Sequence, residues 1–252
     1  MFTVLVLTIA ILMIAMLYSA VGHAGASGYL AAMAIVSTMP QEEMKAVALT
    51  LNIFVGGIGT YHFVRAGHFH WRTFWPFATA AVPMAFVGGL WTLPTSVFNP
   101  LIGVVLLYAA VVLALKARAL TRPHPPVHTT MPPLPMAMSC GVVLGLLAGL
   151  TGTGGGIFLS PLLLIAHWAS PQRTAAVTIV FVLVNSLAGL GGVIAEQPSL
   201  PATLPIYVLA ALAGGLIGSN LGARVLPGHG IRLLLSIVLM IAAVKMFITT
   251  AV

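Results

Sequence analysis

The stretch Gly152-Thr153-Gly154-Gly155-Gly156 interrupts two apolar runs in the second half of the chain. A sparser copy, Gly22-His23-Ala24-Gly25-Ala26, occurs 130 residues earlier. Flexible breaks at matching positions of two hydrophobic halves are typical of secondary transporters, whose substrate sites lie between internal repeats. The two stretches therefore predict a membrane transporter with its substrate site where the two turns meet.

The composition places the chain among polytopic membrane proteins. Of its 252 residues, 60% are apolar and 5% are charged, against about 25% charged in an ordinary soluble domain. The formal net charge of +7 comes from ten Lys and Arg that are scattered singly among apolar runs. Because they form no single basic face, no nucleic-acid partner is expected. Cys140 is the single cysteine, so the chain can form no internal disulfide.

A proline-rich stretch at 119–135 divides ten apolar segments into two groups of five. The segments cover residues 2–21, 26–39, 44–64, 73–92, 98–117, 136–150, 155–168, 174–194, 203–223 and 232–251. A straight span needs about 20 residues to cross a hydrocarbon core of about 30 Å. The second and seventh segments, of about fourteen residues each, are too short. We therefore expect an all-α polytopic membrane protein with about 8–10 membrane segments, in which short broken or re-entrant segments meet near the midplane.

Further matches between the halves indicate a duplication. At offsets of 130 to 133 residues, Pro40-Gln41, Asn52, Gly56 and Gly59 correspond to Pro171-Gln172, Asn185, Gly189 and Gly192. We expect one transmembrane repeat at 1–118 and another at 136–252. The linker at 119–135 contains six prolines, which exclude a helix there and predict a solvated, extended connector.

The placement of charge predicts that the two repeats insert with opposite orientation. If each short segment pairs into a re-entrant hairpin, eight Lys and Arg fall on the linker side of the membrane, and all three acids fall on the other side. The positive-inside rule then puts the linker in the cytoplasm of a bacterium and the multi-pass chain in its inner membrane. Since five segments per half is an odd number, the halves form an inverted repeat.

The glycine turns have the chemistry of an anion site. Glycine admits positive φ and lets a ligand approach the main chain closely. Successive amides beside a helix N-terminus attract an anion, and a helix begins just after each turn. His23, Ser27, Thr151 and Thr153 add hydrogen-bond donors. The alternative is that the glycines serve close packing between helices.

Three stretches carry a resemblance to a known family. Residues 150–164 read LTGTGGGIFLSPLLL, residues 171–178 read PQRTAAVT, and residues 67–71 read GHFHW. Residues 150–164 resemble the glycine-rich signature of the sulfite exporter TauE/SafE family, residues 171–178 resemble its following element, and residues 67–71 resemble its connector after the third segment. Ser19 to Leu30 is similar to the first-half turn of some members. Essentially the whole chain is covered, although Ala24 and Ala26 stand where a fuller glycine run would be. The resemblance implies an integral inner-membrane carrier of sulfur oxyanions or organosulfonates, often an exporter.

Two amides and two cations complete the candidate site. Asn52 and Asn185 lie well within their apolar segments, where an amide bonds either a substrate oxygen or a neighbouring helix. Lys45 and Arg173 stand at the mouths of two long segments, where they either attract an anion or snorkel to the interface. The expected substrate-binding residues are Gly22, His23, Gly25, Ser27, Asn52, Gly152, Thr153, Gly154, Gly155, Gly156 and Asn185, with Lys45 and Arg173 in a vestibule.

We therefore predict a secondary transporter of sulfite, sulfoacetate or a related organosulfonate, which exports its substrate by moving one half against the other. Its expected partners are the small anion and membrane lipid, and a homo-oligomer is compatible with the sequence. We expect no cofactor, no metal and no enzymatic activity. A metal-cation permease using His62, His68 and His70 is an alternative, as is a membrane-embedded enzyme with His23 as its base. The chain contains no Asp, so a carboxylate dyad is not expected.

Overall fold

The protein is all-α over the residues that a computed structural model describes, which are 2–91, 93–119, 129–195, 200–224, 240, 243 and 244. The helices are α1 (Phe2–Ser19), α2 (Ala26–Val36), α3 (Gln41–Arg65), α4 (Trp71–Leu90), α5 (Thr95–Ala119), α6 (Leu134–Thr151), α7 (Gly156–Ile165), α8 (Pro171–Ala195) and α9 (Leu204–Arg224). The tenth predicted segment, 232–251, lies almost entirely outside the described residues, as does most of the linker.

Six of the described helices, α1, α3, α4, α6, α8 and α9, are long and apolar enough to cross a membrane. By contrast, α2 and α7 have 11 and 10 residues. At 1.5 Å per residue they are about 15 Å long, which is about half of a hydrocarbon core. The structure therefore confirms a polytopic membrane protein with two short helices at corresponding places.

The predicted linker was too long at its C-terminal end. Helix α6 begins at Leu134, so Pro135 lies in its first turn. Proline is tolerated there because the first N–H groups of a helix have no intrahelical acceptor, and its fixed φ suits the helix. At the other end, α5 continues to Ala119.

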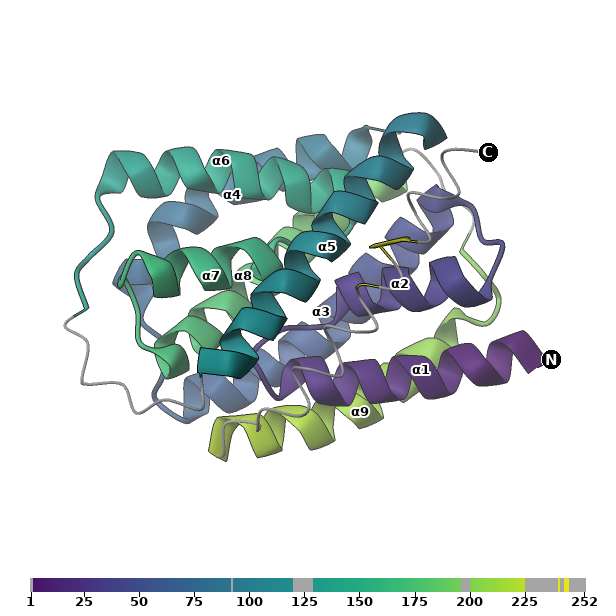
Figure 1. The fold of residues 1–252 in the computed structure, drawn as a ribbon, viewed down its shortest axis with the longest axis horizontal. Helices are drawn as coiled ribbons and strands as arrows, with labels where there is room; N and C mark the ends of the chain where they lie inside the picture. The colour runs from purple at the N-terminus through teal and green to yellow at the C-terminus, as the bar shows by residue number, and fades with distance from the viewer. Residues whose placement is uncertain are drawn as a thin grey trace.

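Equivalent helices of the two halves run in opposite directions. In Figure 1, α1 begins at the right-hand end of the molecule and α6 begins at the left-hand end. The two short helices begin near the centre, and α2 runs outward to the right while α7 runs outward to the left. This arrangement is what an inverted repeat predicts, although the inverted orientation in a membrane stays a prediction.

The same backbone conformation ends the long helix and begins the short helix in both halves. Gly22 and Gly152 have φ of 77° and 72°, and Gly25 and Gly155 have φ of 106° and 77°. Gly25 and Gly155 are the residues directly before α2 and α7. Because only glycine adopts positive φ without a steric penalty, these four positions are determined by the local sequence.

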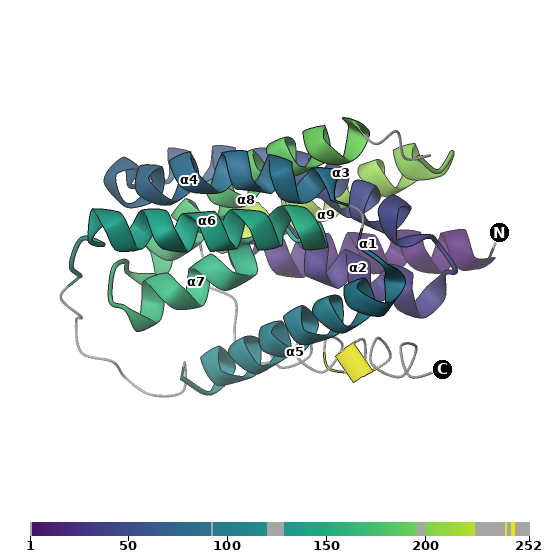
Figure 2. The same ribbon diagram turned by 90° about the horizontal axis from the view of Figure 1, so that it is seen from above.

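The two halves interleave rather than forming separate bodies. Helix α4 of the first half packs on α6 and α8 of the second half, whereas α9 of the second half packs on α1 and α3. One apolar core contains buried residues of α4, α6, α7 and α8. A second is built around α1, α2, α3, α5 and α9 and reaches the facing side of α8. A small third cluster joins Ala46 and Leu49 of α3 to Val193 of α8. Figure 2 shows α4, α6, α7 and α8 grouped at one end and α1, α2 and α3 towards the other.

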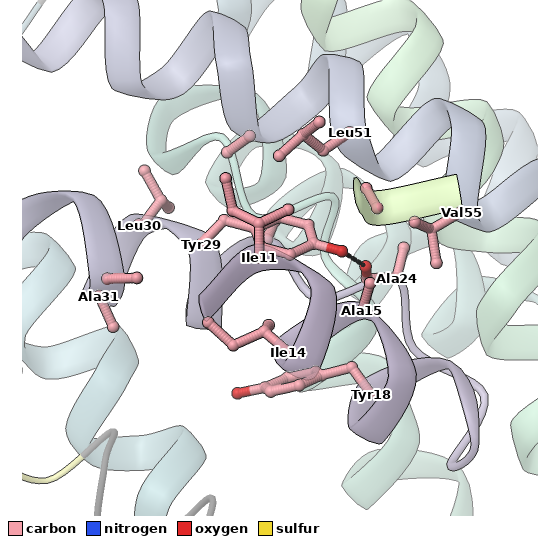
Figure 3. Close-up of a cluster of buried hydrophobic side chains, with 14 of the residues drawn as sticks. Ile11, Ile14, Ala15, Tyr18, Ala24, Tyr29, Leu30, Ala31, Leu51 and Val55 are labelled. Atoms are coloured by element: carbon pink, nitrogen blue, oxygen red, sulfur yellow. Dashed lines mark hydrogen bonds between the residues drawn. The ribbon is translucent and has the colours of Figure 1, made fainter. Parts of the chain in front are cut away.

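The first turn is held in this second core by tyrosines. Figure 3 shows Tyr18 and Tyr29 among Ile11, Ile14 and Leu51, with the Tyr29 hydroxyl donating to the Ala24 carbonyl oxygen at 2.8 Å. This bond satisfies a turn carbonyl that has no helical partner, and the tyrosine ring fills the space beside Gly25. The turn is therefore fixed by packing as well as by its glycines.

Candidate functional site

The two glycine turns meet at Asn52, in the middle of α3. Its side chain is fully buried. Its Oδ1 accepts from the backbone N–H of Ala26 at 3.0 Å, at the start of α2. Its Nδ2 donates to the Thr153 carbonyl oxygen at 3.4 Å and to the Ser186 hydroxyl at 3.2 Å. One amide thus connects the first turn, the second turn and α8.

The second turn is buried and lined by hydroxyls. The Thr151 and Thr153 hydroxyls lie 2.8 Å apart, and Thr151 donates to the Leu147 carbonyl oxygen. A methyl group on Gly154 would lie 2.7 Å from both Asn52 Nδ2 and Ser186 Oγ. Any residue larger than glycine at this position would displace the polar groups around it.

The first turn brings an imidazole to the second short helix. His23 Nε2 lies 3.2 Å from the Ser160 hydroxyl on α7, which lies 3.0 Å from the Thr178 hydroxyl on α8. The imidazole also lies near Gly156, at the start of α7. A hydrogen-bonded chain therefore runs from the first turn into the second half of the protein. Ser27 is also buried, and its hydroxyl donates to the Tyr18 hydroxyl at 3.2 Å.

Asn185 differs from its counterpart Asn52. Its Nδ2 donates to the Phe181 carbonyl oxygen in its own helix at 2.8 Å, and its fully buried Oδ1 has no hydrogen-bond partner among the described residues. Phe181 and Gly189, one turn on either side, contact Gly155 and Gly149. Residues four apart share a helix face, so Asn185 faces the end of α6 and the second turn.

Lys45 and Arg173, the two predicted vestibule cations, have different surroundings. Lys45 is buried, and its Nζ donates to the carbonyl oxygens of Gly88, Gly89 and Trp91 at 3.4, 3.3 and 3.2 Å. A cation there also interacts favourably with the negative end of the α4 dipole. Its side-chain stem lies against Gly152. Arg173 is exposed at the start of α8.

A small pocket opens beside Lys45. It is lined by Gln41, Glu42, Lys45, Trp91, Leu93, Phe98 and Leu150. The Gln41 side-chain amide donates to the Leu93 carbonyl oxygen, and within the described ranges its own side-chain oxygen is buried without a hydrogen-bond partner. Lys45 therefore lies between this pocket and the second turn, although its ammonium is already bonded to the end of α4.

Two of the three histidines of the alternative permease hypothesis, His62 and His70, contact different side chains. His62 Nδ1 lies 2.7 Å from the Ser219 hydroxyl on α9, and His70 Nδ1 lies 2.9 Å from the Thr73 hydroxyl. Among the described residues, no three His, Cys, Asp or Glu side chains gather as a metal site would require. Burial lowers the pKa of His70, and the charges of Arg173 and Arg72 lower it further. These two arginines therefore lie at the same end of the molecule.

Sequence analysis missed three hydroxyls of the candidate site. Ser160, Thr178 and Ser186 lie in apolar helices, and all are buried. Ser186 follows Asn185 directly, and Ser160 precedes Pro161 in the quoted glycine–proline motif. A small polar residue in an apolar helix is a weak signal, since it serves helix packing equally well.

Comparisons with known proteins agree with this architecture. A profile described as Sulfite exporter TauE/SafE matches residues 7–246. "Probable membrane transporter protein y4hK" of Sinorhizobium fredii is 41% identical over 243 residues, which is 95% of this chain and 96% of the relative. Another probable membrane transporter, from Methanocaldococcus jannaschii, is 28% identical over 110 residues, or 40% of each chain. No solved structure matches significantly. The chain is a multi-pass membrane transporter and belongs to the sulfite exporter TauE/SafE family.

Proposed function

We propose that this transporter carries a small sulfur-containing oxyanion, such as sulfite, sulfoacetate or a related organosulfonate, out of the cell across a bacterial inner membrane. The observation that carries the proposal is the meeting of two positive-φ glycine turns at Asn52. The family name supplies the sulfur chemistry. The substrate would bind where the turns, α3 and α8 converge.

The groups around the turns suit an anion. Two short helices begin there, and a helix N-terminus carries about half a positive charge. Hydroxyls of Thr151, Thr153, Ser160, Thr178 and Ser186 surround the turns. Glu42 and Glu43 lie in the first turn of α3, away from its middle. The described part of the site therefore has donors without an opposing carboxylate.

The direction of transport follows from the membrane potential. Moving one elementary charge through 100 mV is worth about 2.3 kcal/mol. An anion leaving a negatively charged cytoplasm gains this energy, so export needs no intramembrane Asp or Glu relay. We therefore propose uniport-like export by alternating access, in which the turns face one side of the membrane and then the other.

A ligand screen on purified protein tests the substrate class. Thermal unfolding should be measured with sulfite, thiosulfate, sulfoacetate, taurine and sulfate. A ligand that binds the folded state raises the unfolding temperature as its concentration rises. We expect this for at least one sulfur oxyanion, followed by flux of the same anion into proteoliposomes. If none of the five stabilises the protein or crosses the membrane, the proposed substrate class is wrong.

A further inference from the structure

We propose that transport moves two four-helix bodies against each other, each built from both halves of the sequence. The α1 body consists of α1, α2, α3 and α9, and the α6 body consists of α4, α6, α7 and α8. This inference rests on the proposed alternating access and names the parts that move. The fourth helix of each half, α4 or α9, belongs to the body whose other three helices come from the other half.

The α6 body is held together by backbone contacts. A methyl group on Gly145 or Gly149 of α6 would overlap the carbonyl oxygens of Ala81 and Ala85 on α4. A methyl group on Gly192 of α8 would overlap the Phe86 carbonyl oxygen, which also belongs to α4. No layer of side chains separates these helices, so sliding one past another would meet immediate steric overlap. Their apolar core is shared by all four helices.

Equivalent contacts hold the α1 body. Methyl groups on Gly214 and Gly218 of α9 would overlap the carbonyl oxygens of Leu12 and Met16 on α1. Hydrogen bonds add to this packing, because Ser219 of α9 lies 2.7 Å from His62 Nδ1 on α3. Helix α9 is therefore fixed to two helices of the other sequence half.

The seam between the bodies is made mainly of side-chain contacts. Where α3 crosses α8, a methyl group on Gly56 would lie 3.4 Å from Leu183 Cβ, and one on Gly59 would lie 2.8 Å from the Ile179 side chain. One apolar core contains buried residues of both helices. The backbones approach each other at the first turn, where a methyl group on Gly22 would lie 2.5 Å from Ala175 Cα. Polar contacts cross the seam as well, and they are Asn52 with Thr153 and Ser186, His23 with Ser160, and Lys45 with the end of α4. Side chains at such a crossing can change rotamer and exchange partners for water or ligand, whereas the backbone contacts along α6 and α9 leave no side chains to rearrange.

The two bodies have the same pattern of helix contacts. Each helix of the α1 body has an equivalent in the α6 body: α6 for α1, α7 for α2, α8 for α3 and α4 for α9. Under this equivalence, packing of α1 on α9 becomes packing of α6 on α4, and packing of α3 on α9 becomes packing of α8 on α4. Two equivalent bodies that meet at α3 and α8 can then take each other's conformation. Movement of residues 1–118 against 136–252 would instead break both sets of backbone contacts.

Reversible cross-linking separates the two movements. In a Cys140→Ser background, Phe86→Cys with Gly191→Cys joins α4 to α8 inside the α6 body. A methyl group on Gly191 would lie 3.6 Å from the Phe86 ring. Gly56→Cys with Leu183→Cys joins α3 to α8 across the seam. Both pairs tie the first half to the second, so each serves as the control of the other. The pairs are closed with a short bis-methanethiosulfonate reagent and reopened with reductant.

With radiolabelled sulfite in proteoliposomes, we expect the Phe86/Gly191 link to leave at least half of the flux. The Gly56/Leu183 link should reduce flux at least tenfold, and reductant should restore it. If both links abolish flux, or if neither link does, the inference of two mixed bodies is wrong. A protein that moves no sulfite before cross-linking would instead contradict the proposed substrate, and the next measurement does not depend on that substrate.

Spin-label distances in nanodiscs provide that measurement. Met13 and Phe86 belong to the same half but to different bodies, whereas Met13 and Leu216 belong to different halves but to the α1 body. All three side chains are exposed and can carry labels after substitution by cysteine. We expect two distance populations for Met13/Phe86 and one for Met13/Leu216. The reverse pattern, or a single distance for both pairs, would overturn the inference.

Discussion

The backbone N–H of Ala26 donates to the side-chain oxygen of Asn52 at 3.0 Å, and this bond fixes the start of α2 to the middle of α3. The corresponding oxygen of Asn185 has no hydrogen-bond partner in the part of the chain that the structure describes. Two residues at equivalent positions of the repeat are therefore in different hydrogen-bonding states within one structure.

This difference predicts that substitution of Asn52 lowers stability more than substitution of Asn185. Asn52→Leu leaves the Ala26 N–H and the Thr153 carbonyl oxygen buried without their partner, at a cost of about 1–3 kcal/mol. Asn185→Leu removes an oxygen that is already unpaired, so we expect no loss of stability. Thermal unfolding of both purified variants checks this. Equal destabilisation would show that Asn185 Oδ1 is bonded in the folded protein.

Gly154→Ala should abolish anion binding in a protein that still folds. Gly154 has φ of 72°, and the added methyl group would lie 2.7 Å from Asn52 Nδ2. The left-handed conformation costs a non-glycine residue about 1–2 kcal/mol. The matched control is Gly57→Ala, because Gly57 is helical and a methyl group there meets nothing within 4 Å. Thermal shifts with sulfite compare the two variants. Equal sulfite binding by both would contradict the role of the second turn.

Gly155→Val is a harsher test of the same turn. Gly155 has φ of 77°, and a Cβ there would lie 3.1 Å from Phe181 and from Ala148 Cβ. We expect an inserted protein without anion binding, because a β-branched residue blocks both positive φ and close ligand approach. Full binding in a folded preparation would exclude backbone amides of this turn from the site.

Lys45→Met should lower stability more than it lowers anion affinity. The variant keeps the apolar stem against Gly152 but loses the ammonium that bonds three carbonyl oxygens at the end of α4. We expect a cost of about 1–2 kcal/mol, which is the upper end of what a cation contributes at a helix C-terminus. Thermal unfolding and sulfite affinity are measured together. A vestibule role would give the opposite result, with unchanged stability and weaker, less salt-dependent binding.

Flux should follow the membrane potential rather than a pH gradient. In proteoliposomes, an imposed potassium-diffusion potential should change sulfite flux, and reversing its sign should reverse the effect. Flux that is independent of the potential and follows a pH gradient would instead indicate proton coupling, with His23 as the proton carrier. In that case Ser160→Ala, which breaks the chain from His23 to Thr178, should abolish the pH dependence while His23 stays in place.

Features that depend on neighbouring residues could be predicted from the sequence alone. The short lengths of α2 and α7, the breaks before them and the positive φ of Gly22, Gly25, Gly152 and Gly155 were all indicated by local composition. They follow from helix length, from the absence of a glycine side chain and from apolar runs. Pro135 was misjudged, because a proline ends a helix in its interior but is tolerated in its first turn.

Contacts between distant segments were decided by the tertiary structure. The sequence does not determine which polar groups Asn52 and Ser186 bond to. The crossing of α3 and α8 places Asn52 Nδ2 3.2 Å from the Ser186 hydroxyl. The same holds for Lys45, whose ammonium lies at the end of α4 because α3 packs there. Sequence order divides the chain into two halves, but each helix packs where its small residues allow close approach. The glycines of α6 and α9 find that surface on helices of the other half, and this packing makes the bodies mixed.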